Sequence, residues 1–378
     1  MRGKGPRGQR VKGSSEEPDI RAEQCEIAPD AEFGPDVVVR CRRLVVGAGV
    51  KVGVPGADGF RLPAGVRVDC DELVLGAGTS LGRSLLLAGG RFEFGPGSRV
   101  GHGGTFRVKD ELVLGPACQF GPGNLVEGRR IRIGRELWTG PEVRIGGGSC
   151  FEVQSSLVAG YWLHLGMRVF VNTARPVTIG NEVGIGTGSS IFTHGAYQSA
   201  LAGYPVSFAP VSIGDNCWLP GAVVNPGVSI GAGTVVGVGS VVNRSLPQGC
   251  LAAGVPCRVL KESVFPKSLS AAEQRSFFRT FLADAAPMLA EFTGSPAKSA
   301  SDGLTLELGT SLVRFESDAA RVVVEEGSRG AAFFLLGEKR AAGPAGRLSE
   351  KLRDLLRRHG IRFKTEVKDG AYQDWEEA

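Results

Sequence analysis

The chain has 378 residues, of which 42% are hydrophobic, only 7% are aromatic and 57 are glycine. Most of the glycine precedes residue 255, and a segment so rich in glycine and so poor in aromatic residues excludes a conventional packed α/β core. The formal net charge is +5, much of it in two basic segments, residues 1–13 and 352–364. Basic tails are usually solvated, so we expect no nucleic-acid partner.

The sequence also gives no sign of a secreted or membrane protein, or of a metal-binding protein. No positively charged segment followed by an apolar one opens the chain, and no apolar run approaches the ~20 residues of a membrane span, so we expect a cytoplasmic protein without a membrane partner. The cysteines form no CxxC pair, so we expect reduced, buried side chains and no metal site. They are Cys25, Cys41, Cys70, Cys118, Cys150, Cys217, Cys250 and Cys257.

Residues 1–34 are expected to be a disordered basic tail, and an irregular repeat follows over residues 35–160. Its most regular apolar positions step by 19, 20 and 19 residues, and the first three of them have an apolar partner six residues further on. These positions are Leu75, Phe94, Leu114 and Ile133. A period of six fits neither a helix nor a single long strand. It predicts a coil of three short strands, with apolar side chains inside and small residues at the corners.

The repeat becomes cleaner over residues 161–262 and is then interrupted. Ile191 and Ile213 are 22 residues apart, where the period predicts six or twelve. Insertions in a solenoid form loops, and loops carry function, so we expect this loop to cover a site. It begins at His194, and an imidazole, with an ordinary pKa of about 6.5, is suited to accept a proton from a hydroxyl near neutral pH.

Residues 161–261 resemble the hexapeptide-repeat acyltransferases, specifically the galactoside and maltose O-acetyltransferases. The resemblance rests on the stretch "SIGDNCWLPGAVVNPGVSIGAGTVVGVGSVVNRSLPQGCLAAGVPCRVLK", on its ending "AAGVPCRV", and on the 24 residues between His194 and Trp218. It implies a left-handed parallel β-helix, a homotrimer, and an acetyl-CoA site in the groove between neighbouring chains. A small-molecule or glycan acceptor is implied as well.

The resemblance also implies roles for individual residues. His194 matches the general base, Asn172 matches an acceptor-side asparagine, and Phe170 lies where the family often has an aromatic residue beside the sugar. Trp218 matches the tryptophan that lines the reaction groove. The remaining positions that match the coenzyme A site are Gly221, Val238, Asn243, Arg244, Arg258 and Lys261.

Several of these residues also have a structural interpretation that involves no ligand. Trp218 also fits a packing residue at a trimer interface, and Asn172 fits a polar ladder within the stack. The cations of the closing coils, Arg244, Arg258 and Lys261, fit a solvated edge as well as a phosphate site. No metal is required, because a thioester is already activated.

Differences from the family limit how far these residue roles can be assigned to this chain. Leu219 and Ile230 are 11 residues apart where the family has 12, which we expect to disturb the register beside Trp218 and the backbone contacts of Gly221. His164 is expected to flank the acceptor pocket, because it is near Asn172 in the sequence. The large aromatic residues of the N-terminal coils are expected to fill or cap the core.

After residue 262 the glycine pattern ends, and residues 263–378 predict a small α+β domain. A serine-capped helix is expected over 268–292, a linker over 293–303, and a basic helix that closes on Gly360. Four runs predict strands before that helix, and a final strand is expected over 361–367. We expect this domain to bind a partner or to clamp the trimer.

The sequence as a whole predicts an acetyl-CoA-dependent O-acetyltransferase that acts on a hydroxyl of a sugar or glycan. The alternative is a non-enzymatic scaffold whose donor site is vestigial. The 11-residue coil favours the scaffold, whereas the presence together of His194, Trp218 and Arg258 favours the enzyme.

Overall fold

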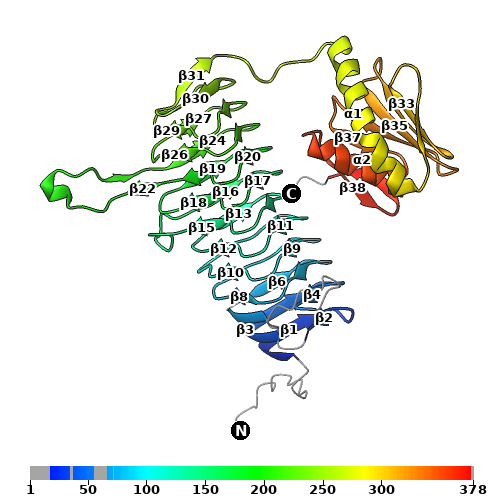
Figure 1. Cartoon of the computed structure of the whole chain (residues 1–378). Helices are drawn as coiled ribbons and strands as arrows, with labels where there is room; N and C mark the ends of the chain where they lie inside the picture. The colour runs from blue at the N-terminus through cyan, green and yellow to red at the C-terminus, as the bar shows by residue number, and fades with distance from the viewer. Residues whose placement is uncertain (1–17, 35–36, 55–65, 71, 376–378) are drawn as a thin grey trace, which may run out of the picture. The chain divides into compact units, whose positions relative to one another are not determined.

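The computed structural model describes residues 18–34, 37–54, 66–70 and 72–375. The chain divides into two compact units, Met1–Pro266 and Lys267–Ala378, each with its own hydrophobic core. The first unit is a stack of coils and the second combines two helices with antiparallel strands (Figure 1). The predicted fold class, a left-handed parallel β-helix followed by a small α+β domain, is confirmed.

Three sheets form the faces of the first unit, parallel except for the antiparallel pair of β30 and β31 at the end of face 2, and each regular coil runs from face 3 to face 2 to face 1. Face 1 contains β1 (Asp19–Ile27), β3 (Val37–Val46), β5 (Val66–Cys70), β8 (Leu85–Leu87), β10 (Thr105–Phe106), β12 (Leu125–Val126), β15 (Arg144–Gly146), β18 (Phe170–Asn172), β21 (Ser190–Ile191), β26 (Val223–Val224) and β29 (Val241–Val242), with β6 (Leu73–Leu75) paired to β3. Face 2 contains β2 (Glu32–Phe33), β4 (Lys51–Val52), β7 (Ser80–Leu81), β9 (Arg99–Val100), β11 (Gln119–Phe120), β14 (Trp138–Thr139), β17 (His164–Leu165), β20 (Gly184–Ile185), β25 (Trp218–Leu219), β28 (Val235–Val236), β30 (Leu251–Ala253) and β31 (Arg258–Lys261). Face 3 contains β13 (Ile131–Ile133), β16 (Leu157–Ala159), β19 (Val177–Ile179), β24 (Val211–Ile213) and β27 (Ser229–Ile230).

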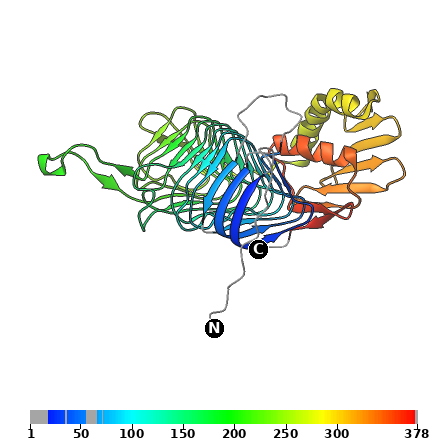
Figure 2. The same ribbon diagram turned by 90° about the horizontal axis from the view of Figure 1, so that it is seen from below.

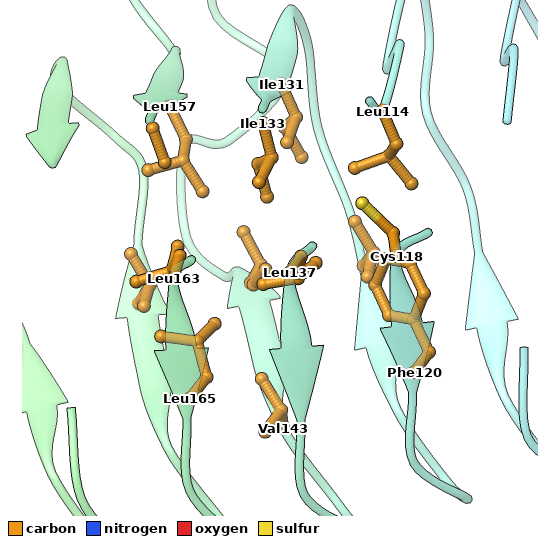
Figure 3. Packing of buried hydrophobic residues seen from close by; sticks show 14 of the residues in the cluster. Leu114, Cys118, Phe120, Ile131, Ile133, Leu137, Val143, Leu157, Leu163 and Leu165 are labelled. Atoms are coloured by element: carbon orange, nitrogen blue, oxygen red, sulfur yellow. The ribbon is translucent and has the colours of Figure 1, made fainter. Parts of the chain in front are cut away.

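The core of the solenoid consists of rows of apolar side chains that repeat from coil to coil. Figure 3 shows one such row, in which Cys118, Leu137 and Leu163 lie side by side with exposed fractions of 0%, 1% and 0%. Neighbouring strands pair in register, so that an inward residue in one coil lies beside an inward residue of the next. The apolar positions that define the sequence repeat are therefore the inward positions.

The cysteines mostly follow the prediction. Cys118, Cys150, Cys217, Cys250 and Cys257 are buried, and burial raises the pKa of the Cys118 thiol to about 12. The prediction is wrong for Cys25, which is exposed because β1 is the terminal strand of face 1 and buries few of its side chains, and Cys41 is only half-buried. The side chain of Cys70 lies outside the described residues.

The expected disordered tail over residues 1–34 is wrong in its second half. Residues 19–27 form β1, which pairs in parallel with β3 from Asp19↔Val38 to Ile27↔Val46. Backbone hydrogen bonding holds this polar strand, whose side chains are mostly exposed. Residues 1–17 lie outside the described residues, so the rest of that expectation is not addressed.

The shortened coil after Trp218 keeps its register, contrary to expectation. Trp218 pairs with Gly184 on one side and with Val235 on the other. The missing residue is absorbed in the turn that follows β25, where the Gly221 N–H donates to the Leu219 carbonyl at 3.0 Å. Gly221 has a φ of +85°, which glycine adopts without strain, so the turn tightens and the strands stay aligned.

The 22-residue interruption forms a hairpin arm, defined as residues 194–208. Its strands are β22 (His194–Gly195) and β23 (Ser207–Phe208), and a 3₁₀ turn, η1 (Ala200–Ala202), lies between them. Figures 1 and 2 show the arm leaving the stack of coils sideways. Its apolar side chains are unusually exposed, with 96% of Tyr197 and 101% of Leu201 accessible.

The second unit packs two helices on an antiparallel meander. The helices are α1 (Ala271–Thr293) and α2 (Arg347–Arg358). The strands are β32 (Ala297–Ser299), β33 (Thr305–Leu308), β34 (Ser311–Glu316), β35 (Arg321–Glu326), β36 (Ala331–Leu335) and β37 (Arg340–Ala342), followed by the hairpin β38 (Thr365–Lys368) and β39 (Ala371–Asp374). Phe278 of α1 stacks on Phe315 of β34 at 4.0 Å between ring centroids, which joins helix to sheet.

Three details of this unit differ from the sequence expectations. Residues 297–299 of the expected linker form an edge strand, because they pair through backbone with β33. The helix α2 is C-capped by His359, and Gly360 follows with a φ of +79°. The expected final strand over 361–367 begins only at Thr365, because Phe363 is buried in the core before the hairpin starts.

Candidate functional site

His194 lies at the corner where the chain passes from face 1 to face 3, here called the 1/3 corner. It is the first residue of the arm, and it pairs with Phe208 as the arm returns. The Ala209 N–H donates to the Thr193 carbonyl at 3.0 Å, which closes the base of the arm. The imidazole is half-buried and is therefore held by the solenoid while its edge remains accessible.

The side chain of Asn172 fixes the orientation of this imidazole. Asn172 Oδ1 lies 2.8 Å from His194 Nδ1, and it also accepts from the Thr193 hydroxyl at 2.7 Å. Asn172 Nδ2 donates to the Gly146 carbonyl at 3.0 Å, so the amide cannot be turned around without losing these bonds. His194 Nδ1 must therefore be the donor, and Nε2 carries the free lone pair of a base.

A run of three glycines, Gly146–Gly148, lies against the imidazole and Asn172. A Cβ atom on Gly148 would lie 3.2 Å from His194 Nε2, and one on Gly147 would lie 3.0 Å from Phe170 Cζ. Gly146 and Gly147 have φ values of +128° and +90°, a backbone conformation that favours glycine. The run thus leaves space at Nε2 of His194.

An aromatic ring and an ion pair complete the surroundings of the imidazole. Phe208 stacks on His194 at 5.5 Å between ring centroids, and the Arg175 guanidinium lies 4.7 Å from the centre of the Phe208 ring. Arg175 also pairs with Glu152 at 3.3 Å. A hydrogen bond from Ser149, helped by Arg175, holds the pKa of Glu152 below its usual range.

Asn172 does not lie where the family resemblance places it. Its side chain is fully buried, and its oxygen and nitrogen are occupied by Thr193, His194 and Gly146. It therefore contacts the His194 imidazole and has no free face for an acceptor. Phe170, two residues earlier on β18, is half-buried and lines a cavity on face 1.

The structure does not bring Trp218 near His194 within one chain. Trp218 lies on β25 of face 2, with 56% of its surface exposed, whereas His194 lies at the 1/3 corner. In a three-sided prism this corner is opposite face 2, so the hydrophobic core separates the two side chains.

His164 also lies on face 2, stacked on Trp138 at 4.3 Å, and so it does not flank Asn172 as expected. Of the large aromatics expected to fill the core, Trp162 is buried but Trp138 is 37% exposed.

The other expected coenzyme A residues divide between the same two regions. Gly221 and Val238 lie at the turns between face 2 and face 1, and Arg258 and Lys261 lie on β31 at the end of face 2. Asn243 and Arg244 follow β29, at the 1/3 corner two coils beyond His194. A single chain thus presents His194 on one side and most of the expected donor-binding residues on the other.

Some residues of this site have no individual signal in the sequence. Thr193, Phe208 and Arg175 act through contacts that span 14 to 21 residues. The glycine run 146–148 was detectable, because three consecutive glycines break the repeat. Among the residues that the structure describes, no cluster of three or more His, Cys, Asp or Glu could hold a metal ion. None of the described helices has the length and apolar character of a membrane span.

Comparisons with known proteins support the sequence resemblance. No family model matches the chain. The galactoside O-acetyltransferase of Escherichia coli strain K12 is 32% identical over 112 residues, which are 26% of this chain and 54% of that protein. The chain therefore spans about half the length of this curated relative. The predicted resemblance to the hexapeptide-repeat acetyltransferases is confirmed.

Solved structures give similar matches. A hexapeptide-repeat acetyltransferase from Vibrio cholerae is 28% identical with a TM-score of 0.30, over 34% of this chain and 70% of its own. A galactoside acetyltransferase in complex with coenzyme A is 27% identical with a TM-score of 0.31, over 36% of this chain and 70% of its own.

Proposed function

We propose that this protein is an O-acetyltransferase that transfers the acetyl group of acetyl-CoA to a hydroxyl of a sugar or glycan. The observation that carries the proposal is the His194–Asn172 hydrogen bond, which presents Nε2 of an oriented imidazole at the accessible edge of a solenoid corner. The similarity to galactoside O-acetyltransferase, over the part of the chain that it covers, supports the same reaction.

In the proposed reaction, His194 Nε2 accepts the proton of the acceptor hydroxyl as the oxygen attacks the thioester carbonyl carbon. A C–O bond forms, the C–S bond breaks, and the proton passes from Nε2 to the departing thiolate of coenzyme A. Asn172 keeps Nδ1 protonated throughout and stabilises the imidazolium that forms in between. The thioester supplies the driving force, so positioning and one proton transfer suffice.

The donor site is proposed to lie between two chains of a homotrimer. Trp218, Arg258 and Lys261 lie on face 2, away from the His194 of the same chain, so a complete site needs face 2 of a neighbour. The exposed side chains of the arm, such as Tyr197 and Leu201, are the kind of surface that a second chain covers. Arg258 and Lys261 are exposed cations suited to the phosphates of coenzyme A.

The scaffold alternative loses its main support in the structure. It was favoured by the short coil after Trp218, but that coil keeps the strands in register. A scaffold role also does not require a half-buried imidazole whose Nδ1 is hydrogen-bonded to Asn172 and whose Nε2 lies beside Gly148.

Calorimetric titration of acetyl-CoA tests the donor site directly. We expect micromolar binding to the wild-type protein and at least about tenfold weaker binding to Arg258→Ala, because one charge-assisted contact to phosphate is lost. Arg329→Ala, an exposed arginine in the second unit, is the matched control. Absence of binding to the folded wild-type protein would leave the scaffold as the working interpretation.

A further inference from the structure

A cavity of about 370 Å³ opens on face 1 beside the proposed acceptor site. Its lining includes Arg144 and Phe170, which are neighbours on the paired strands β15 and β18. Gly123, Glu142 and Arg168 complete the wall from the turns between face 2 and face 1. The missing side chain at Gly123 leaves this part of the surface hollow, with a Cβ position 3.7 Å from Glu142 Cγ.

The side chains that line the cavity carry a net positive charge, because two arginines, Arg144 and Arg168, face one glutamate, Glu142. Arg168 Nε donates to Glu142 at 2.7 Å, and this hydrogen bond holds the pKa of Glu142 below its usual range, so that pair is neutral overall. Within the described part of the chain, the side chain of Arg144 makes no hydrogen bond and no ion pair. Its guanidinium is therefore available to an anion that enters the cavity.

The cavity is connected to the proposed base through Phe170 and the glycine run. Gly147 would touch Phe170 and Gly148 would touch His194 if either carried a Cβ, so two successive glycines bridge the cavity wall and the imidazole. Phe170 and Asn172 are two residues apart on one strand, which is about 7 Å. This separation is comparable to the length of one sugar ring, and the Phe170 ring offers an apolar surface for its C–H face.

We propose that the acceptor is an anionic sugar whose acidic group binds Arg144 in this cavity. The sugar ring then packs against Phe170, and a hydroxyl of the same or the next residue reaches His194 Nε2. A carboxylate matches the planar guanidinium through two parallel hydrogen bonds, and a phosphate or sulfate ester offers the same chemistry. The assignment of this cavity to an acceptor rests on the proposed acetyltransferase function, whereas the anion site itself does not.

A direct binding experiment tests the anion site separately from the proposed acetyltransferase function. Saturation-transfer NMR and titration on the full-length protein, without acetyl-CoA, would use matched pairs of methyl glycosides of glucose, galactose and mannose and of the corresponding uronic acids. Sugar 6-phosphates form a third arm that distinguishes carboxylate from phosphate. Arg144→Gln tests the site, and Arg99→Gln, an exposed arginine at an outward position of face 2, is the matched control.

We expect at least one acidic sugar to bind about tenfold more tightly than its neutral partner, with an affinity that falls as salt rises. Arg144→Gln should abolish this preference, and Arg99→Gln should retain it. Equal binding of acidic and neutral sugars by the wild-type protein, or an unchanged preference in Arg144→Gln, would overturn the proposal.

Acetyl transfer to the same sugars, measured as release of the coenzyme A thiol, tests whether the cavity binds the acceptor of the proposed reaction. Preferential transfer to the acidic sugar that binds, lost in Arg144→Gln through a higher KM, supports the acceptor assignment. Binding of an acidic sugar without any transfer would support the anion site and contradict the proposed enzymatic function.

Discussion

The Nδ1 atom of His194 lies 2.8 Å from Oδ1 of Asn172, a side chain that is itself fully buried between β15 and the start of the arm. This relationship links the regular solenoid to the hairpin arm that interrupts it. The coil supplies a rigid acceptor for the imidazole proton, and the arm supplies the imidazole. The imidazole is therefore oriented by a buried side chain of the solenoid.

Asn172 is expected to act through His194. Asn172→Ala should lower kcat by about 10- to 100-fold, because the imidazole loses its orientation and its preferred tautomer. The KM for acetyl-CoA should change little. In a His194→Ala background the same substitution should have no further effect on kcat, and steady-state kinetics of both single variants and the double variant measure this. Independent, multiplicative losses would show that Asn172 does not work through His194.

Gly148 is expected to keep space for the acceptor at Nε2. Gly148→Ala places a Cβ 3.2 Å from this atom and should lower kcat/KM for the acceptor by about tenfold or more, since a misplaced hydroxyl loses alignment. Gly195→Ala is the control, because a Cβ there meets nothing within 4 Å. Similar kinetics for the two variants would exclude this steric role.

The proposed division of the site between two chains predicts complementation. His194→Ala and Trp218→Ala should each be inactive, but mixed trimers that contain both variants should regain about a third of wild-type activity, because one of their three interfaces combines an intact His194 with an intact Trp218. Coexpression with two different tags, followed by tandem purification, yields the mixed trimers. Mixed trimers that stay inactive would place both residues in a site formed by one chain.

The start of α1 predicts a pH dependence of the second unit. Hydrogen bonds from Lys267 and from Ser270 lower the pKa of Glu273 to about 2 from its ordinary 4.5. Because the folded state favours the carboxylate, this stabilisation is present above pH 4.5 and is lost as the pH falls towards 2. Glu273→Gln should therefore lower the thermal midpoint at neutral pH, and its difference from wild type should shrink in acid.

Far-UV circular dichroism near the helix minimum follows this unit selectively, because both described α-helices belong to it. Glu291→Gln, on the exposed side of the same helix, controls for the loss of a charge. A constant difference between wild type and Glu273→Gln over the whole acid range would contradict the proposed capping interaction.

The sequence predicted the coils because each inward residue repeats a local pattern of size and spacing. It did not reveal β1, since this polar terminal strand is held by backbone pairing with β3 and carries no such pattern. The register after Trp218 was also missed, because a one-residue deletion can be absorbed by a tight glycine turn, and Gly221 provides that turn.

The site was predictable only in part, for a related reason. His194 follows from its place at a break in the repeat. The role of Asn172 depends on the carbonyl of Gly146, which is 26 residues away, and on the return of the arm at Phe208. Such contacts are set by how coils stack, and a single sequence does not show which outward residues share a corner.

The most direct measurement of the central claim is the rate of acetyl transfer from acetyl-CoA by wild-type protein and by His194→Ala, with a panel of neutral and acidic glycosides as acceptors. We expect transfer by the wild-type protein and a loss of about 100-fold or more in kcat for His194→Ala, with unchanged affinity for acetyl-CoA. A variant that binds acetyl-CoA normally and keeps more than about a tenth of the wild-type rate would contradict the assignment of His194 as the general base.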